Sequence, residues 1–179
     1  MSSKMLQLFA GVGALTFVAS GATEVVHHQG DPLKTATDYG IEVGLAAGLL
    51  LTLAGLYKLH LQQERDLSSF GIWAFRVAAC GQAVLGIVAA ATILRGQDAL
   101  GPLFPLGVLA WAGGTLAYAV TTAKAAVLPR WVPVALAVGT LAGIAVNPGG
   151  TIIVGVLWLA LATTVLGDRS ALRPAAGAA

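Results

Sequence analysis

Residues 39–61 read YGIEVGLAAGLLLTLAGLYKLHL, and residues 70–94 read FGIWAFRVAACGQAVLGIVAAATIL. Each stretch is longer than the about 20 mostly apolar residues that an α-helix needs to cross the roughly 30 Å hydrocarbon core of a bilayer. The first stretch holds two charged residues, Glu42 and Lys58, and the second holds one, Arg76. These two stretches therefore predict helices that span a membrane.

The composition of the 179-residue chain leads to the same class of protein. Hydrophobic residues make up 57% of the chain and charged residues 10%, whereas a soluble domain carries about 25% charged residues. So few charges cannot cover a soluble globule of this size, and the apolar content is too high for a disordered chain. The balance of ten Lys and Arg residues against eight Asp and Glu residues is too even to indicate nucleic-acid binding. We therefore predict an integral membrane protein that contacts the lipid bilayer.

Six stretches qualify, or nearly qualify, as membrane spans, and the polar sequence between them is too short for a separate soluble domain. They are continuously apolar, unlike the alternating segments of about ten residues that form a membrane β-barrel. We predict an all-α, polytopic transmembrane bundle of about six helices, with a single domain over residues 1–169 and a disordered tail at 170–179. The predicted spans are residues 5–23, 39–61, 70–94, 100–127, 131–146 and 151–167.

The basic residues predict the orientation of the bundle, because cytoplasmic loops carry an excess of lysine and arginine. With a cytoplasmic N-terminus, two of the ten basic residues, Lys34 and Arg95, fall on the outer side, and the other eight fall on the inner side. We therefore expect both termini in the cytoplasm of a multi-pass protein of the cell membrane. The inner residues are Lys4, Lys58, Arg65, Arg76, Lys124, Arg130, Arg169 and Arg173.

The first span has a second interpretation. Lys4, the apolar run up to Val18 and the small residues at 19–22 also resemble a secretory signal peptide with its cleavage site. Cleavage would leave five spans without changing the orientation of the others. We expect this segment to be retained as a helix.

Polar side chains inside the spans are candidates for an intramembrane polar network. An arginine below the membrane boundary is costly unless it snorkels to the boundary or finds a partner. Both outcomes are open to Arg76, which lies about 9 Å below the start of its span. Gln82 is a better centre for a network, whereas Glu42 enters from the outer side and is not expected to pair with Arg76. The candidate members are Arg76, Gln82, Glu42, Thr52, Thr115 and Tyr118.

A group of acidic and histidine residues follows the first span. Glu24 shares a helix face with His27 and His28, because residues three and four apart are neighbours. Glu-x-x-His is a spacing by which helices present ligands to one metal ion, and Asp31 follows closely. A divalent-metal site is therefore chemically possible, but a solvated outer loop explains the same residues and is the interpretation we favour. His60 belongs to a separate cluster, which we expect at headgroup level at the inner end of the second span.

The sequence lacks the common catalytic motifs, including Gly-x-Ser-x-Gly, His-Glu-x-x-His and the phosphate-binding Gly-Lys-Ser/Thr loop. We therefore favour a non-enzymatic protein that acts as a structural or partner subunit or binds a small hydrophobic molecule, with no cofactor favoured. A transporter or channel with a polar path around Arg76 and Gln82 is the alternative. A membrane enzyme or metal-binding protein using Glu24, His27 and His28 is a second alternative.

Two small-residue motifs bear on oligomeric state. Gly44-x-x-x-Gly48 and Gly139-x-x-x-Gly143 have the spacing that lets membrane helices approach closely. They would fit a homo-oligomer seam or an interface with a membrane-protein partner. We favour packing inside one bundle, because the pattern is common in apolar sequences.

Three further segments carry a resemblance to a known family: LYKLHL at residues 56–61, Arg76 soon after the start of its span, and VLPRW at residues 127–131. Together they resemble small polytopic membrane proteins of actinobacteria, a domain family of unknown function with about six spans. A glutamate in the second span and an arginine in the third recur there, and Glu42 and Arg76 occupy the matching positions. The resemblance covers about residues 40–165, although the first loop is shorter than in the family. It implies a six-span bundle in a bacterial membrane and no particular reaction.

Overall fold

The fold is an all-helical bundle. The computed structural model describes residues 2–27, 32–97, 101–146 and 148–167. These residues form six α-helices and no strand, which confirms the predicted all-α class; the predicted tail at 170–179 lies outside them. The helices are α1 (Ser3–Val26), α2 (Ala36–Gln63), α3 (Ser69–Arg95), α4 (Leu103–Ala125), α5 (Trp131–Ala145) and α6 (Gly150–Thr164).

The helices fall into two length classes. α1 to α4 have 23 to 28 residues and are long and apolar enough to cross a membrane. α5 and α6 have 15 residues each, or about 22 Å at 1.5 Å per residue. The last two helices are therefore shorter than the hydrocarbon core of a typical bilayer.

Local capping signals set the ends of the long helices. α2 begins with a capping box, in which the Thr35 side chain accepts from the Asp38 backbone N–H and the Asp38 side chain accepts from the Thr35 backbone N–H. Ser68 caps α3 by accepting from the Gly71 backbone N–H. Gly96 ends α3 with a φ of 70°, in the left-handed region that favours glycine.

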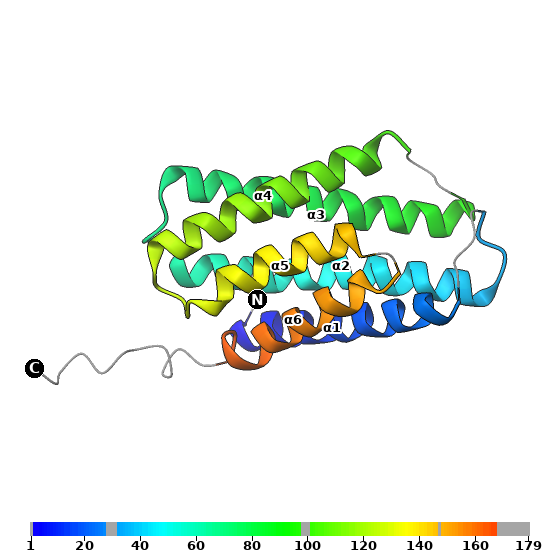
Figure 1. The fold of residues 1–179 in the computed structure, drawn as a ribbon, viewed down its shortest axis with the longest axis horizontal. Helices are drawn as coiled ribbons and strands as arrows, with labels where there is room; N and C mark the ends of the chain where they lie inside the picture. The colour runs from blue at the N-terminus through cyan, green and yellow to red at the C-terminus, as the bar shows by residue number, and fades with distance from the viewer. Residues whose placement is uncertain (1, 28–31, 98–100, 147, 168–179) are drawn as a thin grey trace, which may run out of the picture.

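The six helices form a closed ring in chain order. Each helix packs against the next one, and α6 packs back against α1 (Figure 1). We call the end of the bundle where α1 begins the proximal end and the end where α1 finishes the distal end. Successive helices run in opposite directions, so α2, α4 and α6 all finish at the proximal end.

Small residues allow the helices to approach closely within the chain. The first motif places Gly44 against Ser20 of α1 and Gly48 against the ring of Phe17. The glycines of the second motif face side chains of α4 and α6. Both motifs therefore pack inside one chain, as we favoured, and a homo-oligomer stays a prediction that rests on other surfaces.

Candidate ligand-binding cavity

The turn of the α5–α6 hairpin stops short of the distal ends of α1, α2 and α3 (Figure 1). It passes through Gly149, whose φ is 101°, and lies beside Val25 of α1. On the other side of the ring, Gly143 of α5 lies against Trp111. α4 extends distally from Trp111 by eight residues to Leu103, or about 12 Å. The hairpin therefore does not cover the distal turns of α1, α2 and α3.

A cavity of about 890 Å³ occupies this space and is lined by residues of all six helices. Its volume lies within the roughly 300–1,000 Å³ that is typical of small-molecule sites. Most of its lining is apolar. The large apolar side chains around it are Phe17, Leu33, Ile41, Leu45, Leu49, Leu85, Val88, Phe104, Val108, Trp111, Ile144, Val146 and Val154.

A buried cluster closes the cavity on its proximal side. Phe17, Leu49, Leu85 and Val154 come from four different helices and pack together, with Trp111 against them. Each of the four is less than 9% exposed. The cluster separates the cavity from the centre of the bundle, so the cavity belongs to the distal half of the molecule.

The cavity also has a polar side, formed by α1, α2 and α6. Glu24 and Glu42 both line it, and Glu42 is only 9% exposed. The Ser20 hydroxyl donates to the Ile41 carbonyl at 2.8 Å, which holds α1 against α2 at this level. Thr151 lines the same side, and its hydroxyl oxygen is buried without a hydrogen-bond partner among the described residues.

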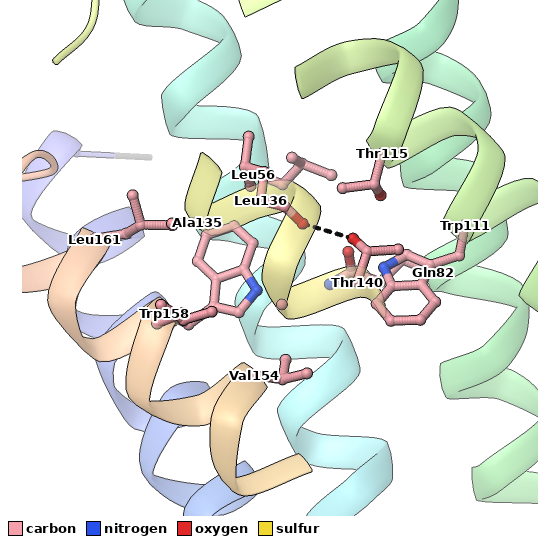
Figure 2. A pocket seen from close by; sticks show the side chains of 12 residues that line it. Leu56, Gln82, Trp111, Thr115, Ala135, Leu136, Thr140, Val154, Trp158 and Leu161 are labelled. Atoms are coloured by element: carbon pink, nitrogen blue, oxygen red, sulfur yellow. Dashed lines mark hydrogen bonds between the residues drawn. The ribbon is translucent and has the colours of Figure 1, made fainter. Parts of the chain in front are cut away.

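Gln82 lies in the centre of the bundle, below the cavity. Its Nε2 donates to the Leu49 carbonyl at 2.8 Å and to Thr52 Oγ1 at 2.9 Å. Gln82 and Thr115 also line a small enclosed space of about 20 Å³ between α4, α5 and α6, which Figure 2 shows. Thr140 borders this space and donates to the Leu136 carbonyl at 2.7 Å. The structure thus brings together Gln82, Thr52 and Thr115.

Arg76 lies apart from this group. It is exposed on α3, and its guanidinium carbon lies 5.3 Å from the ring centroid of Trp73. It forms no salt bridge within the described residues. The separation of six positions between Arg76 and Gln82 corresponds to about 240° around the helix, so the buried Gln82 and the exposed Arg76 face different surroundings. Glu42, the third candidate, lines the distal cavity instead.

The residues of the candidate metal site are only partly described. His28 and Asp31 lie outside the described residues. His27 Nε2 lies 3.0 Å from Asp38 Oδ1, and Oδ2 of Asp38 accepts from the Thr35 backbone N–H. Among the described residues, no group of three His, Cys, Asp or Glu side chains could hold a metal ion. The metal site stays a prediction.

Two polar residues near the end of α2 are buried at the proximal end: Lys58, which we expected on the inner side, and His60, which we expected at headgroup level. Lys58 and His60 are each 5% exposed. The Lys58 ammonium donates to the carbonyls of Ser3 and Leu166. The His60 ring stacks on Phe75, with ring centroids 3.8 Å apart. α2 continues to Gln63, and neighbouring helices cover its last turns, so His60 is packed inside the bundle. Its expected depth at headgroup level stays a prediction.

Gln63 was not identified from the sequence at all. Its Nε2 donates to Tyr118 Oη at 2.7 Å and to Thr122 Oγ1 at 3.0 Å. Tyr118 therefore forms a hydrogen bond with Gln63, and we had expected it to belong to the group around Gln82. The signal that could have revealed this contact is the spacing of Leu56, Leu59 and Gln63, which continues one helix face at intervals of three and four residues.

The chemical character of the cavity is that of an apolar chamber with acidic residues on one side. Its described lining contains hydroxyls such as Ser20 and Thr92 but no histidine, cysteine or lysine that could activate them.

No protein-family model, curated protein or solved structure matches the chain. Function is therefore inferred from the cavity and its lining.

Proposed function

We propose that the protein is a six-span protein of the cell membrane, with both termini in the cytoplasm, that binds a small hydrophobic molecule in the distal cavity. The four long apolar helices support a membrane location. Short spans such as α5 and α6 can be accommodated by local thinning of the bilayer. Arg65, Lys124 and Arg130 are exposed near the proximal end, which supports a cytoplasmic location for that end.

The size of the cavity is the observation that carries the proposal. The space measures about 890 Å³, which lies within the range of small-molecule sites. An apolar lining orders water poorly, so an apolar molecule from the bilayer is the occupant that fits this space best.

We expect Val88→Trp to remove the bound molecule. Val88 lines the cavity and is 4% exposed, so an indole there would occupy the ligand's space. Ile87→Trp is the matched control, because Ile87 is the next residue of α3 but is 59% exposed. Native mass spectrometry of protein purified from membranes should show retained small molecules on the wild type and on Ile87→Trp, and at least about tenfold fewer on Val88→Trp. Equal retention by both variants, with both folded, would contradict the proposal.

The family resemblance supports the six-span topology, and membership of that family, the bacterial source and any protein partner stay predictions. The alternative of a transport path around Arg76 and Gln82 is less well supported. Arg76 is exposed beside Trp73, whereas Gln82 is 3% exposed and bonded to α2. A transport path through the centre of the bundle would therefore be lined by Gln82 but not by Arg76.

A further inference from the structure

We infer that one buried water molecule binds in the small enclosed space between α4, α5 and α6 and joins Thr115 to the polar group around Gln82. The inference goes beyond the proposed function, because it concerns the centre of the bundle instead of the distal cavity. It follows from the hydroxyl of Thr115, the amide of Gln82, and the size and lining of the space that both residues border.

The Thr115 hydroxyl is buried without a partner. Thr115 is 5% exposed, and its Oγ1 has no hydrogen-bond partner among the described residues. Other buried threonines, such as Thr52 and Thr140, donate to a carbonyl of their own helix. The Thr115 hydroxyl instead points into the enclosed space that the residue lines (Figure 2). Ordered water is the usual partner of a buried polar group that the chain itself does not satisfy.

The Gln82 amide supplies an acceptor on the α3 side of the space. Its Nε2 carries two N–H donors and donates to the Leu49 carbonyl and to Thr52 Oγ1. Its Oε1 accepts no hydrogen bond from the described residues, although the residue is only 3% exposed. The contacts with α2 therefore fix the orientation of the amide, and Oε1 can accept from a bound molecule.

The space has the size of one water molecule. It measures about 20 Å³, and a cavity needs about 10–15 Å³ to hold one water. This volume is too small for an organic ligand. Among the described residues that line the space none is charged, so no counter-charge is available for an ion. A third polar group is present in Thr140, whose hydroxyl donates to the Leu136 carbonyl and can also accept.

These three groups match the hydrogen-bonding capacity of a water molecule. The water accepts from the Thr115 hydroxyl and donates to Gln82 Oε1 and Thr140 Oγ1, which gives the about three hydrogen bonds that buried waters typically make. It thereby connects α4 and α5 to the contact between α3 and α2. Trp111, one turn before Thr115, lines both this space and the distal cavity. The water therefore holds the part of α4 that borders the cavity.

The direct test is an experimental structure of the wild-type protein at a resolution that shows ordered waters. We expect one isolated density in the space, within hydrogen-bond distance of Thr115 Oγ1, Gln82 Oε1 and Thr140 Oγ1. Thr115→Ser retains the hydroxyl and should retain this density. Thr115→Val has nearly the same shape without the hydroxyl and should lose it. A wild-type structure without density at this position would overturn the inference, whatever the variants show.

Thermal unfolding in detergent gives a second test, in which the sign of the change decides. With a bound water, Thr115→Val should lower the unfolding temperature by about 3–6 °C, whereas removal of a hydroxyl that has no partner should raise it. Thr163→Val is the matched control, because Thr163 is exposed in α6 and donates to its own helix. We expect the control to lie within about 2 °C of the wild type. A Thr115→Val protein that unfolds no lower than Thr163→Val would overturn the bound water.

Discussion

Replacing Gly114 with leucine is expected to prevent the chain from reaching its folded state. α3 and α4 approach each other at two glycines: a Cβ at Gly114 would meet the backbone of Ala78, and a Cβ at Gly81 would meet the backbone of Trp111. A backbone cannot rotate away as a side chain can, so the two helices would have to separate. Overpacking against side chains costs about 1–3 kcal/mol, and we expect this contact to cost more than about 4 kcal/mol.

The adjacent glycine provides the control. A Cβ at Gly113 would meet no atom within 4 Å, and Gly113 is exposed. Gly113→Leu should keep or raise stability, by up to about 1 kcal/mol, because leucine has a higher helix propensity than glycine. The measurement is the amount of monodisperse protein after detergent extraction, together with its thermal unfolding temperature. A Gly114→Leu protein that unfolds at the same temperature as Gly113→Leu would show that α3 and α4 do not pack in this way.

Replacing Lys58 with methionine is expected to loosen the proximal end by about 2–5 kcal/mol. The Lys58 ammonium donates to the carbonyl of Ser3, at the start of α1, and to that of Leu166, beyond the last residue of α6. It therefore ties both segments to α2. Methionine preserves the length and apolar character of the side chain but donates no hydrogen bond, so the Leu166 carbonyl loses this donor.

Lys124→Met is the control for the change in charge, since Lys124 is exposed in the last turn of α4. It should alter stability by no more than about 0.5 kcal/mol. Thermal unfolding in detergent compares the two variants, and limited proteolysis reports whether the start of α1 has become accessible. If Lys58→Met were as stable and as protease-resistant as Lys124→Met, Lys58 would not have the anchoring role described above.

The sequence allowed the helices to be predicted because the signals for them are local. The third predicted span, residues 70–94, corresponds to a helix at Ser69–Arg95. A serine that caps its start and a glycine that ends it are both visible in the sequence. In a lipid environment the backbone must satisfy its own hydrogen bonds, and an α-helix does so within a single segment. An apolar stretch with these end signals is therefore enough to predict a helix.

The cavity could not be predicted, because it depends on how far the α5–α6 hairpin reaches beside the longer helices. The sequence showed that these spans are short but not where their turn lies relative to Val25 and Trp111. The same lack of three-dimensional information grouped Glu42 with Gln82. Gln82 bonds to Leu49, and Glu42 lies seven residues before Leu49 in α2, or about 10 Å away along the helix.

The burial of Lys58 and His60 was missed for a related reason. The rule that places basic residues at a membrane boundary uses their position along the chain. Burial depends instead on which helices cover that position. Here the start of α1, the end of α6 and the Phe75 ring of α3 cover the last turns of α2.

A structure determined by electron cryomicroscopy in lipid nanodiscs, with a bound antibody fragment to provide size, tests the central claim most directly. We expect six helices within the bilayer and a ligand density in the distal cavity, beside Val88 and Val108. A bundle whose distal helices close together, with no space and no density between α1, α2, α3 and α4, would contradict the proposed ligand-binding function.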